Sequence, residues 1–187
     1  MSYKVEYRIG VAAPVDDVYD LVCDIESWTQ WSPIHKAASG QLKFGAPIHL
    51  EEQYEGLGMW EIDGVLSDWS PYSHIHVFIP KPFYAGKQVR YFEFEALSQT
   101  GSAFTVGALF NGFLAEREGK LISGPVKRGF TAFAEAVKAK AEADFLAKPE
   151  SERTKNRLPP KALPDKLQPP PAPNWKGATF LGQKKKK

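Results

Sequence analysis

Three polar residues lie in apolar stretches of the sequence, where they could do proton chemistry. Glu52 and Tyr54 continue an alternating apolar pattern, and Arg90 has the same parity as Phe92. Because alternate residues of a strand point to one face, we expect all three side chains to face inward. A carboxylate, a phenol and a guanidinium in an apolar cavity can orient a polar ligand group or shift a pKa for proton transfer. The alternative is that they mark the solvent-exposed ends of strands, where bulges change the parity.

Two histidines, His74 and His76, form a second pattern. On a strand they point to the same face and could share a metal. A zinc site needs a third ligand and usually a fourth, and the spacing of the other histidines and carboxylates places none beside them. We therefore predict no metal site, and no motif indicates another cofactor. If His76 points inward with Phe78, it can bond a ligand head group or act as an acid or base.

Apolar residues that recur on one face of the expected strands and helices form a third pattern. They are the candidates for lining a ligand cavity. From the pattern alone, packing in a solid core is the commoner explanation of such aromatic stripes. The ten candidates are Trp31, Trp60, Ile62, Phe78, Phe92, Phe94, Phe104, Phe110, Phe130 and Phe133.

The elements that position these residues follow from the periodicity of the sequence. Alternation over 3–11 predicts a strand, and the valines at helical spacing predict a helix over 14–25, followed by a short helix at 26–31. Strands separated by turn signals but not by helices imply an antiparallel meander. The six expected strands are 35–43, 47–54, 58–69, 73–80, 88–97 and 102–111.

A helical region begins near Phe113 and is punctuated at Gly124-Pro125. After that point, apolar residues such as Phe130 and Phe133 mark one face of a long amphipathic helix, and charged residues mark the other. This is the element large enough to cover the apolar face of the sheet. We expect a cavity between the curved sheet and this helix.

Charge divides the chain into two parts. Residues 1–147 hold 13 Lys and Arg against 19 Asp and Glu, a net charge of −6, and residues 148–187 hold 11 against 3, a net charge of +8. The second part contains eight prolines and predicts a disordered basic tail. We expect weak contact of this tail with an anionic surface through Lys184, Lys185, Lys186 and Lys187. We expect no specific nucleic-acid binding.

The opening strand, the helix start at Ala13-Pro14, residues 18–24 with Trp28, and Trp31-Ser32-Pro33 resemble the entry to a START-like, or SRPBCC, domain. Residues 129–142 are similar to the helix that closes such domains. The resemblance covers residues 1–147. It implies an α+β helix-grip fold, with a curved antiparallel sheet of about seven strands around a long C-terminal helix and two short helices after the first strand. The superfamily includes polyketide cyclase/dehydrase-like and lipid-transfer proteins, so the resemblance implies an apolar cavity for a ligand.

Three functions are compatible with this resemblance. The leading hypothesis is non-catalytic binding or carriage of a hydrophobic small molecule, lipid-like or polyketide-like. One alternative is a cyclase or dehydratase that uses Glu52, Tyr54, His76 or Arg90. Another is a module similar to the chaperone-activator-like members, with a filled core, an exposed apolar patch and an essential tail. The absence of a signal peptide or membrane-spanning segment predicts a cytoplasmic protein.

Overall fold

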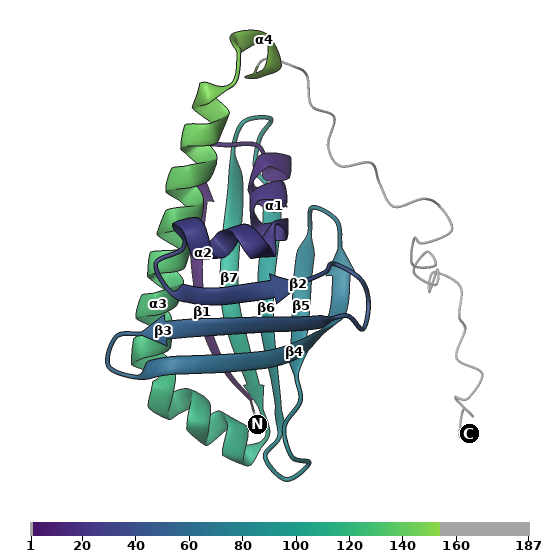
Figure 1. Ribbon diagram of the computed structural model, residues 1–187, viewed down its shortest axis with the longest axis vertical. Coiled ribbons are helices and arrows are strands. Elements are labelled where there is room, and N and C mark those ends of the chain that lie inside the picture. Colours follow the sequence, from purple (N-terminus) through teal and green to yellow (C-terminus); the bar gives the residue numbers. More distant parts are fainter. Residues whose placement is uncertain (1, 154–187) are drawn as a thin grey trace, which may run out of the picture.

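The computed structural model describes residues 2–153. Of the tail expected at 148–187, the part from residue 154 onward, with its four terminal lysines, lies outside the described residues. In the described part, seven antiparallel strands form one sheet in the order β1-β7-β6-β5-β4-β3-β2 (Figure 1). This is the predicted meander, with the first strand returning to pair with the last. The strands are β1 (Ser2–Val11), β2 (His35–Gly40), β3 (Pro47–Tyr54), β4 (Gly58–Ser70), β5 (His74–Ile79), β6 (Lys87–Ala96) and β7 (Ser102–Asn111).

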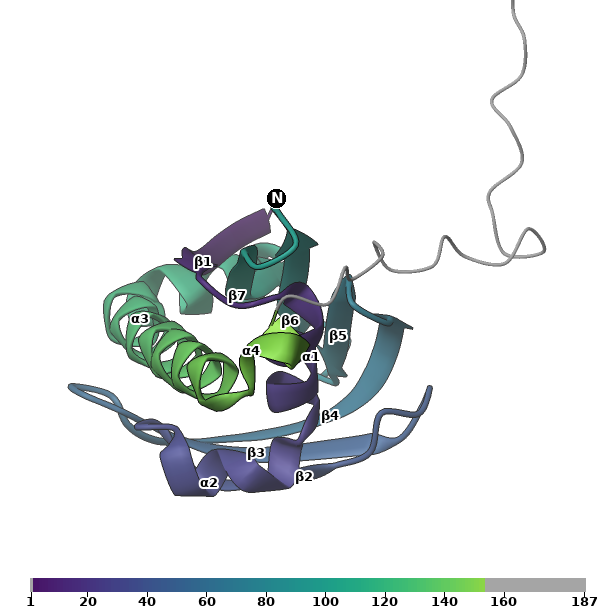
Figure 2. The ribbon, with the colours of Figure 1, turned by 90° about the horizontal axis from the view of Figure 1, so that it is seen from above.

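Helices α1 and α3 lie on the concave face of the sheet. Figure 2 shows the sheet curving around α3, with α1 inside the same curve. This arrangement confirms the predicted helix-grip fold, in which one apolar layer lies between the sheet and the long helix. The helices are α1 (Val15–Cys23), the 3₁₀ helix η1 (Ile25–Ser27), α2 (Trp28–Trp31), α3 (Phe113–Ala147) and α4 (Glu150–Arg153).

Helix α3 continues through Gly124-Pro125, where the sequence predicted an interruption. Proline has no N–H group, so the carbonyl of Leu121 loses its helical partner and the helix bends instead of ending. Figure 1 shows the first part of α3 running in a different direction from the rest. Although α3 has 35 residues, no helix within residues 2–153 is both long and apolar enough to cross a membrane.

Strand β4 contains a β-bulge that affects the outer face of the sheet. The register pairs Leu66 with Val77 and Asp68 with His76, so Ser67 is an extra residue on β4. An extra residue reverses the alternation of the side chains beyond it. Leu66 is therefore buried in the core, whereas Asp68 is exposed beside β5.

Candidate functional site

Three polar side chains meet on the concave face of the sheet, in the layer covered by α3. Glu52 on β3 accepts hydrogen bonds from Arg90 on β6, at 2.5 Å between Nη1 and Oε1 and 2.9 Å between Nη2 and Oε2. The Tyr54 hydroxyl donates a third hydrogen bond to Glu52 Oε2 at 2.5 Å. All three residues are at most 2% exposed, and charged residues are almost never buried this fully unless they are paired. The structure thus brings together three of the four polar residues selected from the sequence.

His35 at the start of β2 is the fourth member of this buried cluster. Its Nε2 lies 3.2 Å from Glu52 Oε1, an ion-pair distance at which the angles do not make a hydrogen bond. Its Nδ1 lies 2.6 Å from Ser32 Oγ. The sequence pattern did not indicate that His35 lies in this cluster. The β2–β3 register sets His35 opposite Glu52, but only through a shift between His35 and Ala37 that the sequence does not signal.

Aromatic rings and α3 enclose the cluster. The Arg90 guanidinium carbon lies 4.6 Å from the centre of the Phe130 ring, a cation–π contact. The His35 ring lies 4.7 Å from Trp28 and 4.9 Å from Phe133, centre to centre. The charged groups are therefore surrounded by apolar surface rather than by water.

The charge of Arg90 controls the ionisation of this site. Burial alone would raise the pKa of Glu52, but Arg90 and His35 outweigh it and lower that pKa to about 2. Burial raises the pKa of Tyr54 well above 10. Burial alone would lower the pKa of Arg90, but Glu52 and Tyr54 outweigh it and raise that pKa. At neutral pH the cluster therefore contains a carboxylate, a guanidinium cation and a neutral phenol.

Two nitrogen atoms of the cluster are left without hydrogen bonds. Arg90 Nε and His35 Nε2 are buried and have no hydrogen-bond partner among residues 2–153. A buried polar atom without a hydrogen-bond partner destabilises the folded protein by about 1–3 kcal/mol. Each nitrogen, when it carries a proton, can donate a hydrogen bond to an oxygen atom of a carbonyl, hydroxyl or carboxylate group.

The aromatic rings around the cluster are themselves buried. A cavity of about 10 Å³ lies between the α1–α2 segment and the sheet, and Trp28 and Phe92 help to line it. That volume has room for about one water molecule. Among the ten lining candidates, Trp31 and Trp60 are half-buried against the core, and those that are buried are Ile62, Phe92, Phe94, Phe104, Phe110, Phe130 and Phe133.

The last lining candidate, Phe78, and the last polar candidate, His76, lie on the outer face of the sheet. From the sequence, an inward orientation had been considered for both. On β5 the buried side chains are Ile75, Val77 and Ile79, so the residues of opposite parity point outward. Three β-branched residues at alternate positions were the signal in the sequence for this orientation. His76 is therefore separated from the buried cluster by the sheet.

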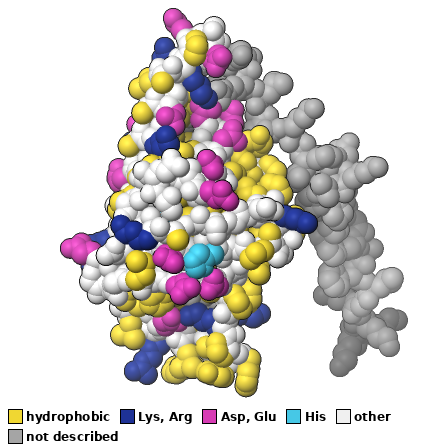
Figure 3. Space-filling model, viewed as in Figure 1, with side chains coloured by type: hydrophobic (Ala, Val, Ile, Leu, Met, Phe, Trp, Pro, Cys, Tyr) yellow, Lys and Arg dark blue, Asp and Glu magenta, His cyan; other side chains and the backbone are white. Residues whose placement is uncertain are grey.

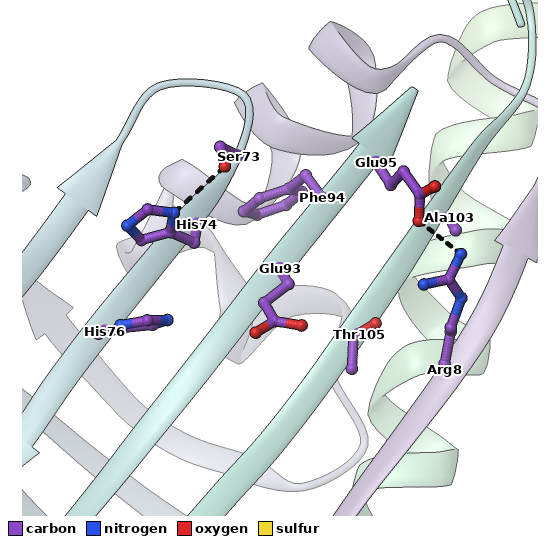
Figure 4. A pocket seen from close by; sticks show the side chains of 9 residues that line it. All are labelled: Arg8, Ser73, His74, His76, Glu93, Phe94, Glu95, Ala103 and Thr105. Carbon is purple, nitrogen blue, oxygen red and sulfur yellow. Dashed lines mark hydrogen bonds and ion pairs between the residues drawn. The ribbon is translucent and has the colours of Figure 1, made fainter. Parts of the chain in front are cut away.

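On the outer face His76 lies beside a pocket of about 300 Å³ (Figure 4). His74, Glu93 and Arg8 also line this pocket. Partial burial and the neighbouring His74 lower the pKa of His76. The bulge in β4 adds Asp68, so three side chains that can hold a metal meet there. A second such group contains His49, Glu61 and Asp63.

One end of the molecule presents apolar side chains to solvent. Phe83 and Tyr84 in the β5–β6 loop are 98% and 66% exposed, and Phe113 at the start of α3 is 75% exposed. Figure 3 shows hydrophobic side chains gathered at the end where this loop lies. Lys81 of the loop forms an ion pair with Glu118 of α3. Exposed patches of this kind often mark interaction surfaces.

Solved structures with this fold include enzymes and START proteins. The chain is similar to the Zhui aromatase/cyclase from Streptomyces sp. R1128, with 18% identity, a TM-score of 0.59, and coverage of 76% of this chain and 94% of that one. For a START superfamily protein from Mycobacterium smegmatis the identity is 16%, the TM-score 0.59 and the coverage 75% and 97%. Norcoclaurine synthase from Thalictrum flavum, solved with dopamine and hydroxybenzaldehyde, has 11% identity and a TM-score of 0.58. The match covers 80% of this chain and 90% of that one. At these identities the similarity supports the fold and not an activity.

Sequence comparison identifies the family. No curated protein matches the chain at a significant level. Residues 2–142 match the family described as polyketide cyclase/dehydrase and lipid transport, and this range contains all four members of the buried cluster. Because the match spans most of the chain and the fold agrees with it, the protein belongs to the polyketide cyclase/dehydrase and lipid transport family.

Proposed function

We propose that the protein binds a hydrophobic small molecule that carries an oxygen-containing polar group, in the layer between the sheet and α3. The observation that carries this proposal is the buried pair of unpartnered nitrogens, Arg90 Nε and His35 Nε2, among aromatic rings. An oxygen of the ligand would accept hydrogen bonds from this pair. The apolar remainder of the ligand would lie against Phe92, Phe130 and Phe133.

The energetics of the buried ion pair support a role in binding. Replacing a buried ion pair by apolar residues is often neutral or stabilising by about 1–4 kcal/mol. Stability alone therefore does not explain the buried Glu52–Arg90 pair. A binding role explains why an apolar layer contains it.

The same cluster is better suited to binding than to proton transfer. With a pKa of about 2, Glu52 is a weak general base at neutral pH. Tyr54, with its pKa raised, is a weak acid, and its proton is already engaged by Glu52. These two properties favour a carrier or sensor over the cyclase or dehydratase alternative.

The ligand would need space that side chains now fill. The short helix α2 is the element we expect to move, because it has four residues and its Trp31 is only half-buried. The Trp31 ring stacks on Phe133 at 5.7 Å with an interplanar angle of 14°. Displacing Trp31 would open the aromatic layer without breaking a strand pair.

Native mass spectrometry of the freshly purified protein, followed by organic extraction, tests the proposal. We expect a stoichiometric apolar molecule that is lost in Phe133→Asp. The matched control is Phe113→Asp, on the exposed start of the same helix, which should retain the ligand. A ligand-free mass, with no thermal shift across a panel of lipids and polyketides, contradicts the proposal.

The exposed apolar end and the small cavity favour one second candidate, a protein-interaction module. Phe83 and Tyr84 would then contact a partner protein, and the basic tail would recruit it. Removing residues 154–187 separates the two candidates, since binding within the sheet-and-helix layer should survive the truncation. Replacing Phe83 and Tyr84 by serine should likewise leave small-molecule binding unchanged.

A further inference from the structure

Asp68, His74 and His76 form a compact group on the outer face of the sheet. Asp68 Oδ2 lies 3.2 Å from His74 Nε2 and 3.6 Å from His76 Nδ1. The three atoms all lie within 4.8 Å of one another. The two imidazole rings are 4.7 Å apart between centres, with an angle of 32° between their planes. The group thus brings two imidazole nitrogens and one carboxylate oxygen close together on one face of the sheet.

The β4 bulge is what completes this group. Without Ser67 as an extra residue, Asp68 would share the inward parity of Leu66. With the bulge, Asp68 pairs directly with His76 on the outer face. Since β4 and β5 are both central strands of the sheet, the backbone holds the three side chains in a fixed relative position.

Two of the three separations in this group match tetrahedral zinc coordination. With metal–ligand bonds of about 2.1 Å, neighbouring ligand atoms lie about 3.4 Å apart in a tetrahedral site. The observed separations of 3.2 Å and 3.6 Å lie on either side of that value. The remaining pair, the two imidazole nitrogens, lie within 4.8 Å of each other, and rotation of the rings would have to bring them to the same spacing.

A neighbouring hydroxyl orients one of the imidazoles. His74 Nδ1 lies 3.2 Å from Ser73 Oγ, which directs Nε2 toward Asp68. Metal-bound histidines usually have such a partner on the second ring nitrogen. His74 Nε2 is buried and has no hydrogen-bond partner among the residues that the structure describes.

We propose that Asp68, His74 and His76 bind one zinc ion, with a water molecule as the fourth ligand. Two histidines and one carboxylate with an open position are a recurrent zinc ligand set. His74 and His76 line the pocket of about 300 Å³, and Glu93 of β6 lines the same pocket (Figure 4). Glu93 can accept a hydrogen bond from the bound water. The site lies across the sheet from the buried cluster, so it is independent of the proposed ligand binding.

The experiment is a titration of the untagged, full-length, EDTA-treated protein with Zn²⁺ by calorimetry, and with Co²⁺ by visible absorption. We expect saturable 1:1 binding and the intense absorption bands of tetrahedral Co²⁺. Asp68→Asn, His74→Ala and His76→Ala should each weaken binding by at least about tenfold, since even outer-sphere partners contribute about 10- to 100-fold. All three side chains are partly exposed, so the variants should fold, which circular dichroism checks.

His49→Ala is the matched control, because His49 belongs to the second group of candidate ligands. The sequence has four histidines, and the fourth, His35, is buried in the cluster beneath α3. Zinc affinity unchanged in His49→Ala supports the proposed site. Absence of saturable binding, or affinity lost in His49→Ala and retained in His74→Ala, overturns it.

Discussion

Arg90 and Glu52 are joined by two hydrogen bonds, although two strands of the sheet lie between them. On a flat sheet, strands β6 and β3 would be roughly 14 Å apart. The curvature of the sheet around α3 brings the two side chains together across the concave face (Figure 2). The ion pair therefore links the two halves of the curved sheet from the inside.

Glu52→Gln should strongly destabilise the protein. The substitution leaves Arg90 as a buried charge without its counter-ion, and breaking a buried pair in this way costs about 3–5 kcal/mol. Urea unfolding measures the difference. The control is Glu95→Gln, which removes the exposed Arg8–Glu95 pair and should change the free energy of unfolding by less than about 1 kcal/mol. Equal effects of the two substitutions would contradict the assignment of Glu52–Arg90 as a desolvated pair.

The double substitution Glu52→Leu with Arg90→Met should separate stability from binding. Because both charges leave the interior together, we expect a free energy of unfolding equal to or above that of the original protein. Binding of the co-purifying ligand should nevertheless be weakened, since its polar group has lost the Arg90 donor and keeps only His35. Unfolding curves and native mass spectrometry on the same sample check both. Retained ligand in a stable double variant would show that the cluster has only a structural role.

Acid should destabilise the protein through Glu52. The pKa of Glu52 is about 2 in the folded protein against an ordinary value of 4.5. The stabilisation that the ionised carboxylate gives to the folded state is therefore fully present above about pH 4.5. It is lost as the pH falls toward 2, by about 3 kcal/mol in total. Urea unfolding at pH 6, 4 and 3 measures the loss. The double variant lacks this carboxyl, so it should lose less stability over the same range, and identical pH dependence would refute the prediction.

Gly129→Ala should be destabilising even though alanine favours helices. A Cβ atom at residue 129 would overlap the ring of Tyr54, which packs directly against α3. Overpacking of this kind costs about 1–3 kcal/mol and outweighs a helix propensity gain of about 1 kcal/mol. Thr131→Ala on the same helix should be neutral or slightly stabilising. Chemical denaturation of the two variants gives the comparison, and a more stable Gly129→Ala would show that Tyr54 has room to move.

Much of the fold could be predicted because the strands alternate regularly and α3 has a clear apolar face. The parity of Glu52, Tyr54 and Arg90 was enough to predict that all three face inward, since β3 and β6 contain no bulge between these residues and their neighbours. That they meet depends on the curvature of the sheet (Figure 2), which parity does not give. The continuity of α3 through Pro125 was not predictable from local sequence. Packing of the helix against the sheet on both sides of the proline outweighs the loss of one backbone hydrogen bond.

The outer face shows where local patterns stop being informative. A bulge has no reliable signature in a single sequence, so nothing indicated that Ser67 would turn Asp68 toward His74 and His76. His35 was missed for a related reason. Its position opposite Glu52 depends on a register shift between His35 and Ala37, which a simple hairpin count does not include.

The small interior cavity has a consequence for how fast a ligand can enter. A protein whose apolar layer is already filled has to open before it can accept a guest, so each association event waits for the protein to move. In stopped-flow experiments the observed rate should therefore level off as the ligand concentration rises, at the rate of that opening. The plateau would be the same for every ligand that enters the layer, and ligands would differ mainly in how slowly they leave.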